Sequence, residues 1–114
     1  MATTDRLALA RDFYLAFAAG DRSFAERALD EDFTFSSPLD VGLDRAGFFE
    51  RCWPAAGQLV QEFEFVRLLE SGDEVIVTYV MRRSDGGRGR NTEVLTFKGE
   101  KLLAAEVYFG WEVQ

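Results

Sequence analysis

The fold of this chain is indicated most clearly by the segment Asn91-Thr92-Glu93-Val94-Leu95-Thr96-Phe97. A short polar turn, Lys98-Gly99-Glu100-Lys101, separates it from a second apolar segment that runs from Leu102 to Trp111. This pattern predicts two long β-strands joined by a tight turn. One carboxylate, Glu93, stands among apolar neighbours in the first strand. We expect the strands to wrap around helices of the N-terminal half and to enclose a pocket.

Composition restricts the class of protein. The chain has 114 residues and is 47% hydrophobic, which predicts a single domain, residues 1–114, with a real core. Its net charge of −7 would repel phosphate backbones, so we expect no nucleic-acid partner. No stretch approaches the ~20 apolar residues of a membrane span, so we expect no membrane association. The start of the chain lacks a signal-peptide pattern, and there is one cysteine, Cys52, so we expect a cytoplasmic protein.

Histidine is absent from the sequence. This absence excludes a Ser-His-Asp triad, a Cys-His pair and every histidine metal site. With carboxylates also scattered along the chain, we expect no metal centre and no cofactor. Acid–base chemistry must therefore use Asp, Glu, Tyr, Lys or Cys52. A lone cysteine on an apolar helix face is better explained as a small buried hydrophobic residue than as a nucleophile.

The N-terminal half predicts three helices. The first extends roughly from Thr4, as its N-cap, to Ala19, because apolar side chains recur at helical spacing between Leu7 and Phe17. Gly20 is expected to end this helix in a left-handed conformation.

The second helix is expected to be shorter. Asp21 can cap its start. The acidic run Asp30-Glu31-Asp32 is unfavourable at a helix C-terminus, so the helix should end there. A short alternating strand, Phe33–Ser36, follows, and Pro38 ends it.

The third helix is capped by Asp44, and Leu43 and Phe48 occupy the positions of a hydrophobic staple around the cap. From Leu59 onward the apolar period changes from 3.6 to 2, which predicts four antiparallel strands. Three helices followed by a meander predict an α+β fold, with the helices on one face of the sheet.

Together these features resemble the SnoaL-like and ketosteroid-isomerase-like group of the nuclear-transport-factor-2-like superfamily. The resemblance implies a cone, or cystatin-like α+β roll, in which a strongly curved, mainly antiparallel sheet wraps around three N-terminal helices. It also implies an apolar pocket at the open end and a homodimer formed through the outer sheet face. Three segments carry the likeness: Ala18–Phe33, Ser37–Phe49 and Asn91–Trp111.

Most isomerase positions of that group are replaced in this chain. The resemblance implies a tyrosine on the first helix, but that position is Phe13 here, and Tyr14 lies about 100° further round the helix. The resemblance also implies an aspartate base immediately before the proline that follows the first strand, and that position is occupied by Ser37 here. The second acidic position matches Glu93. Ketosteroid isomerase chemistry is therefore not expected in its usual form.

The candidate catalytic residues are Glu93, Tyr14 and Asp40. In an apolar pocket Glu93 would have a raised pKa and could act as an acid or a base, although an exposed glutamate or an Arg partner would also explain it. Tyr14 could donate a hydrogen bond from the pocket wall, or it could pack in the core with its hydroxyl at the rim. Asp40 could replace the base missing at Ser37, or its loop could simply turn there.

The aromatic and aliphatic residues expected to line the pocket have core packing as their alternative explanation. These candidate ligand-binding residues are Phe13, Phe17, Phe49, Trp53, Phe63, Tyr79, Val107, Phe109 and Trp111. Arginines also surround a glycine-rich hairpin, where they could contact an anionic ligand or balance local acidic charge. These arginines are Arg82, Arg83, Arg88 and Arg90.

Two functions from different classes are consistent with the sequence. The first is a lyase, isomerase or hydrolase that acts on a small apolar molecule, steroid-like or polyketide-like, by carboxylate acid–base chemistry. The alternative is a non-catalytic module that binds apolar ligands or mediates dimerisation, since this scaffold hosts unrelated activities.

Overall fold

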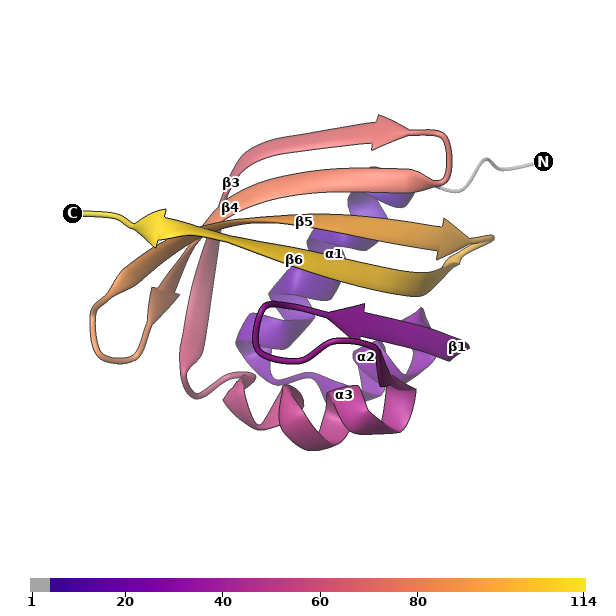
Figure 1. The fold of residues 1–114 in the computed structure, drawn as a ribbon, viewed down its shortest axis with the longest axis horizontal. Coiled ribbons are helices and arrows are strands. Elements are labelled where there is room, and N and C mark those ends of the chain that lie inside the picture. Colours follow the sequence, from indigo (N-terminus) through magenta and orange to yellow (C-terminus); the bar gives the residue numbers. More distant parts are fainter. Residues whose placement is uncertain (1–4) are drawn as a thin grey trace.

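The computed structural model of the chain describes residues 5–114, apart from the side chain of Gln61. It confirms an α+β fold with a strongly curved sheet (Figure 1). The helices are α1 (Arg6–Ala19), α2 (Arg22–Ala28), α3 (Arg45–Arg51) and the 3-10 helix η1 (Trp53–Ala55). The strands are β1 (Leu29–Ser36), β2 (Leu43–Asp44), β3 (Val60–Ser71), β4 (Glu74–Arg83), β5 (Arg88–Lys98) and β6 (Lys101–Glu112).

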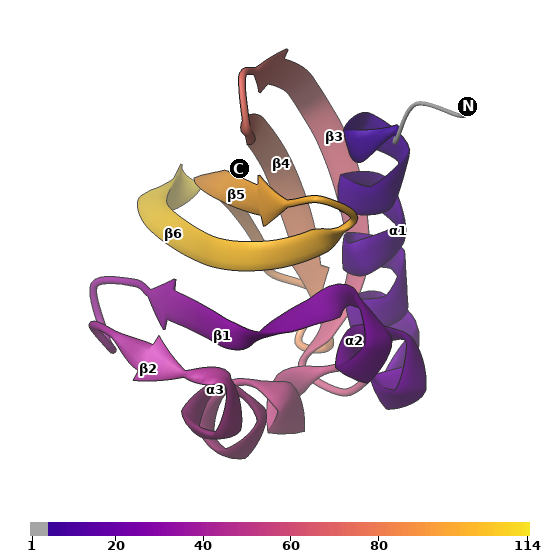
Figure 2. The same ribbon diagram turned by 90° about the vertical axis from the view of Figure 1, so that its right-hand side faces the viewer.

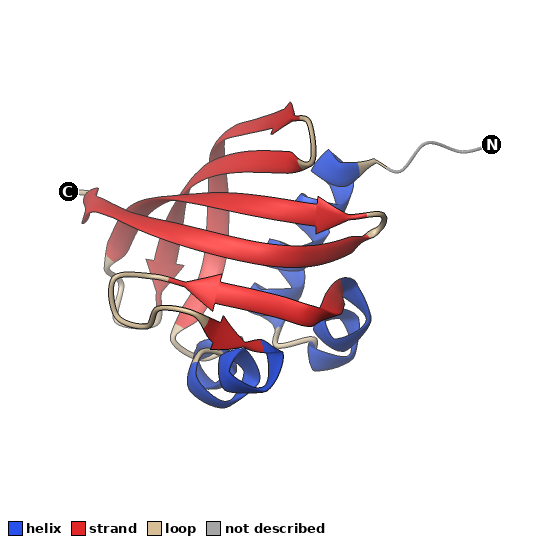
Figure 3. Cartoon of the chain, turned by 45° about the vertical axis from the view of Figure 1, so that its right-hand side comes forward, coloured by secondary structure: helices blue, strands red, loops and turns tan. Residues whose placement is uncertain are grey.

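The strands form one sheet in the order β2-β1-β6-β5-β4-β3. The expected antiparallel meander, β3 to β6, makes up most of it, and β1 pairs with β6 in parallel. Register shifts interrupt the β3–β4 and β5–β6 pairings, and such irregularities bend and twist a sheet. Figures 2 and 3 show the result, a sheet curved around the side where α1 lies.

Helix α1 is defined at both ends by capping. The expected cap, Thr4, lies outside the described residues, and the N-cap of α1 is Asp5, whose carboxylate accepts a hydrogen bond from the Ala8 N–H at 3.1 Å. At the other end Gly20 has φ 71°, and its N–H donates to the Phe17 carbonyl at 3.1 Å. The left-handed glycine predicted there is therefore present.

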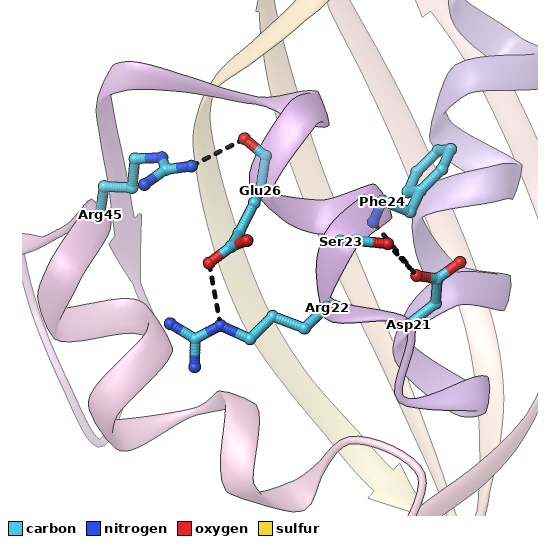
Figure 4. Close-up of polar contacts among 6 residues, drawn as sticks. All are labelled: Asp21, Arg22, Ser23, Phe24, Glu26 and Arg45. Carbon is cyan, nitrogen blue, oxygen red and sulfur yellow. Dashed lines mark hydrogen bonds and ion pairs between the residues drawn. The ribbon is translucent and has the colours of Figure 1, made fainter.

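Helices α2 and α3 are held to one another by a side chain (Figure 4). Asp21 caps α2, because its carboxylate accepts from the Phe24 N–H at 3.2 Å. Arg45, at the start of α3, donates to the backbone carbonyl of Glu26 at 2.7 Å, and Arg22 donates to the Glu26 carboxylate at 3.1 Å. These contacts place α3 below the edge of the sheet formed by β1 and β2.

Two strand predictions need correction. Strand β1 begins at Leu29, so the acidic run that follows α2 is part of the strand. In the next long segment, β3 begins at Val60, after Leu59, and Leu69 is exposed, although a period of 2 that begins at Leu59 puts Leu69 on the apolar face. A register shift between Phe65 and Arg67 reverses the alternation, which turns Leu69 outward.

The core lies between α1 and the concave face of the sheet. Side chains of β4, β5 and β6 on that face are buried together with those of α1, including both Phe13 and Tyr14. In β5 the alternation is regular, with buried residues at every second position from Gly89 to Phe97. This regularity directs the side chain of Glu93 to the concave face, where the packing is incomplete.

Candidate functional site

A cavity of about 300 Å³ lies on the concave side of the sheet. Its wall comes from α1, α3, the loop after β1 and the strands β3 to β6, and it is mostly apolar. The polar side chains used below form two groups. The buried group consists of Tyr14, Tyr79, Asn91 and Glu93, and the outer group consists of Ser37, Asp40 and Arg51.

Glu93 is the charged residue of the buried group. Its side chain projects from the middle of β5, and the residue is 7% exposed. Burial raises its pKa from 4.5 to about 7, because loss of water penalises the carboxylate more than the neutral acid. The neighbouring hydroxyls of Tyr79 and Tyr14 oppose this shift. No ion pair to Glu93 occurs among the described residues, so an arginine partner does not explain it.

Tyr79 fixes the orientation of Glu93. Its hydroxyl donates to Oε2 of Glu93 at 2.8 Å, and it accepts a long contact from Nδ2 of Asn91 at 3.5 Å. Tyr79 and Asn91 are direct partners in the β4–β5 register, so the arrangement follows from strand pairing. Burial, and then the Glu93 charge, raise the pKa of Tyr79 well above 10, so the phenol stays protonated.

Tyr14 brings an unused hydrogen-bond donor beside Glu93. The residue is 2% exposed, and within residues 5–114 its hydroxyl has no hydrogen-bond partner of regular geometry. Burial and the nearby Glu93 charge raise its pKa well above 10. Its ring packs against Phe63 and Tyr79, with centroids 5.2 and 5.3 Å away. The hydroxyl lies close enough to Glu93 to lower the pKa of that carboxyl, but the contact lacks the geometry of a hydrogen bond, and a ligand oxygen would satisfy this donor better.

The outer group is chemically different. Asp40 forms an ion pair with Arg51, with 2.7 Å between Oδ1 and Nε. The hydroxyl of Ser37 accepts from the backbone N–H groups of Leu39 and Asp40 at 3.2 and 3.3 Å, so it stabilises the loop. Both Ser37 and Asp40 line the cavity, but each is already engaged by a protein partner.

The remaining candidates divide between the cavity and other sites. Phe49 and Trp53 are core residues that pack against each other at 5.7 Å and are not part of the cavity wall. Trp111 is 66% exposed and lines a separate hollow. The candidates that line the cavity with Tyr14, Asp40 and Glu93 are Phe13, Phe17, Phe63, Tyr79, Val107 and Phe109.

Sequence reasoning missed several residues of the wall. Asn91 was left out of the candidate residues, although it shares a strand face with Glu93. Arg51 gives no such signal, since only the folded loop brings it to Asp40. Cys52 also lines the cavity, and burial raises the pKa of its thiol to about 11, which keeps it protonated and unreactive.

No group of three or more potential metal-ligating side chains occurs among residues 5–114. Over the same residues, no helix is both long enough and apolar enough to cross a membrane.

The sequence and the fold correspond to a known class of domain. The SnoaL-like domain family matches residues 10–105, which is most of the chain. The chain therefore belongs to the SnoaL-like domain family, as its sequence pattern indicated. No curated protein sequence matches it.

Several solved structures share the fold. An NTF2-like protein of unknown function from Cytophaga hutchinsonii superposes with a TM-score of 0.77 at 18% identity, over 96% of this chain and 93% of that one. A candidate ketosteroid isomerase from Kribbella flavida superposes with a TM-score of 0.78 at 18% identity, over 94% and 78%. A de novo designed protein with a curved β-sheet gives 0.80 at 11% identity, over 96% and 88%. At such identities the likeness concerns the fold alone.

Proposed function

We propose that this protein binds a small apolar molecule carrying an oxygen group and transfers a proton on it. The reaction would be that of an isomerase, lyase or hydrolase acting on a steroid-like or polyketide-like compound. One observation carries the proposal. Glu93, with a pKa near 7, faces an apolar cavity beside the hydroxyl of Tyr14, which makes no hydrogen bond of regular geometry in the described residues. A carboxyl group with a pKa near the working pH is suited to acid–base catalysis.

The roles follow from the contacts. Near pH 7 Glu93 is present both as carboxylate and as neutral acid, so it can accept a proton from the ligand and return it. Tyr14 stays protonated and can donate to the ligand oxygen, where negative charge develops when a proton leaves an adjacent carbon. Tyr79 holds one Glu93 oxygen, which leaves the other oxygen for the ligand.

A second candidate function is ligand binding without turnover. The observation in its favour is that the polar side chains of the outer group already have protein partners. Asp40 is paired with Arg51, and the Ser37 hydroxyl accepts a hydrogen bond within its own loop. Glu93 is then the only carboxylate in the buried part of the cavity wall, among the described residues, and must both take and return the proton.

Binding is tested first by thermal shift with 2-naphthol, a compact phenol. A ligand that binds the folded state raises the melting temperature by mass action. We expect a shift in the wild type that is lost in Glu93→Gln. The matched control is Glu64→Gln, which changes an exposed glutamate on β3. Equal shifts in all three proteins would contradict a role of Glu93 in the pocket.

Turnover is tested with 2-tetralone, an apolar bicyclic ketone, in D₂O. If Glu93 removes a proton next to the carbonyl, mass spectrometry will detect deuterium incorporation above the buffer rate. Glu93→Gln should abolish the excess rate, and Glu64→Gln should retain it. Naphthol binding without any excess exchange would favour the binding function over the catalytic one.

Assembly and location are separate proposals. We propose that the protein forms a homodimer through the outer sheet face, where Tyr108 is exposed and Val94 is half-buried. Sedimentation of the wild type against Tyr108→Glu tests this, since a charge at the centre of an apolar interface should shift a dimer to monomer. Residence in the cytoplasm stays a prediction from the sequence.

A further inference from the structure

A second hollow of about 250 Å³ lies at one end of three neighbouring strands. It is formed by the end of β4, the start of β5 and the end of β6. Figure 1 shows these segments together at the left, where the β4–β5 hairpin and the C-terminal end of β6 project. The residues that the argument uses are Met81, Arg83, Gly89, Phe109, Trp111 and Glu112.

Two glycines, Gly89 and Gly110, line the hollow at positions where neighbouring atoms approach the backbone closely. A Cβ on Gly89 would lie 3.0 Å from Nη1 of Arg83, and one on Gly110 would collide with the backbone carbonyl of Arg90. Gly89 is buried and has an ordinary backbone conformation, so it is the absent side chain that matters there. The Arg83 guanidinium therefore lies directly over the backbone of Gly89.

The walls combine an aromatic surface with a hydrogen-bond donor. Trp111 is 66% exposed, and the Arg90 guanidinium lies 5.2 Å from its ring centroid. This contact supports the indole ring from one side. Arg83 donates to the Glu112 carboxylate at 2.7 Å, so its charge is compensated. A neutral oxygen acceptor suits a compensated guanidinium better than a free anion does.

The hollow adjoins the main cavity. Three residues, Met81, Asn91 and Phe109, line both spaces. Asn91 contacts both ends, because its Oδ1 accepts from the Gly110 N–H at 3.3 Å and its Nδ2 lies 3.5 Å from the Tyr79 hydroxyl. Gly89 lies four positions before Glu93 on β5, which corresponds to about 13 Å along the strand. A rod-shaped molecule of that length would extend from Glu93 to Gly89, which lies beside Arg83.

We propose that this hollow is a distal subsite for the far end of the ligand held by Glu93 and Tyr14. The ligand is then an elongated molecule, with a ring system in the main cavity and a neutral carbonyl, such as an amide or ketone, near Arg83. The main cavity alone is at the lower end of the volumes typical of small-molecule sites, and the second hollow extends it. This inference rests on the proposed function.

The experiment compares a short and a long phenol by calorimetry. The short one is 2-naphthol, and the long one is 4′-hydroxybiphenyl-4-carboxamide, which carries its carbonyl at the far end. The long phenol should bind the wild type more tightly. Trp111→Ala should weaken the long phenol about fivefold, as expected for loss of one aromatic contact, and leave 2-naphthol unchanged. The control is Tyr108→Ala, an exposed aromatic residue on the same strand that lines neither the main cavity nor the second hollow.

A direct readout comes from the two indole N–H signals of the protein, Trp53 and Trp111. In NMR spectra the long phenol should move the Trp111 signal more than 2-naphthol does. An unmoved Trp111 signal, or equal affinity of the long phenol for wild type and Trp111→Ala, would overturn the distal subsite. If 2-naphthol still bound, the proposed function would be unaffected by that result. If neither phenol binds the wild type, both proposals fail.

Discussion

One cavity holds two carboxylates in opposite circumstances. Glu93 is buried on the concave face of the sheet, and its contact there is the hydroxyl of Tyr79. Asp40 lies on the loop after β1 and is paired with Arg51 at 2.7 Å. Burial without a compensating charge brings the pKa of Glu93 to about 7, whereas Asp40 is held in an ion pair. The comparison shows that position in the fold decides whether a carboxylate of this cavity is desolvated or paired with an arginine.

The largest expected contrast concerns packing on the two sides of the cavity. Phe13→Ala should lower the free energy of unfolding by about 3–5 kcal/mol, because it truncates a buried core ring. Leu39→Ala, at a 78% exposed position of the outer loop, should cost less than about 0.5 kcal/mol. Urea unfolding measures both. A cost below about 1 kcal/mol for Phe13→Ala would mean that this face of α1 is not packed as described.

The second contrast is a pH dependence of stability. The folded-state pKa of Glu93 is raised, so its favourable contribution is complete below pH 4.5 and is lost as the pH rises through about 7. The loss amounts to about 3 kcal/mol for a shift of this size. Glu93→Gln cannot titrate and should lack this loss. Subtracting its stability from that of the wild type between pH 4 and 8 isolates the effect, and a flat difference would show that Glu93 is not desolvated.

The third contrast separates the two tyrosines. Tyr79→Phe removes the hydrogen bond to Glu93, so it should cost about 1–2 kcal/mol and raise the Glu93 pKa further. Tyr14→Phe removes a hydroxyl without a regular hydrogen bond, so it should change stability by less than about 1 kcal/mol, in the stabilising direction. Thermal unfolding measures both variants. A large loss in Tyr14→Phe would show that its hydroxyl is engaged in the free protein.

The smallest effect is expected in the outer group. Asp40→Asn breaks an ion pair whose arginine side chain is 59% exposed, so it should cost less than about 1 kcal/mol, and added salt should reduce the difference. Proton exchange on 2-tetralone should continue in this variant if Glu93 carries the reaction. Loss of exchange in Asp40→Asn, with naphthol binding retained, would move the catalytic role to the outer group.

Much of the fold was predictable because its signals are local. Helix α1 and its end at Gly20, the caps at Asp21 and Asp44, and the meander of β3 to β6 all follow from spacing within short segments. The outward turn of Leu69 was not predictable, because it depends on a register shift between paired strands. The start of β1 at Leu29 was missed for a similar reason, since Leu29 pairs with Leu102 of β6 ahead of a register irregularity that contains the acidic residues.

The site was predictable where one strand or one helix determines it. Glu93 faces the cavity because β5 alternates, and Asn91 is on the same face for the same reason. Phe49 and Trp53 illustrate the limit, because an aromatic residue on an apolar helix face can contact either core or cavity. Counting along the chain favoured Phe13 as the position matching a family tyrosine, whereas the packed helix places both Phe13 and Tyr14 on the cavity wall.

The sequence by itself determined the class of fold, the lack of histidine chemistry and the placement of one carboxylate on the inner face of a strand, because periodicity, composition and strand alternation are properties of consecutive residues. Only the tertiary structure decided what that carboxylate can do. The pKa of Glu93, the contact of the Tyr14 hydroxyl with Glu93 and the neutralisation of Asp40 by Arg51 depend on distances between segments far apart in the chain. Desolvation and pairing are set by those distances, which no local pattern specifies.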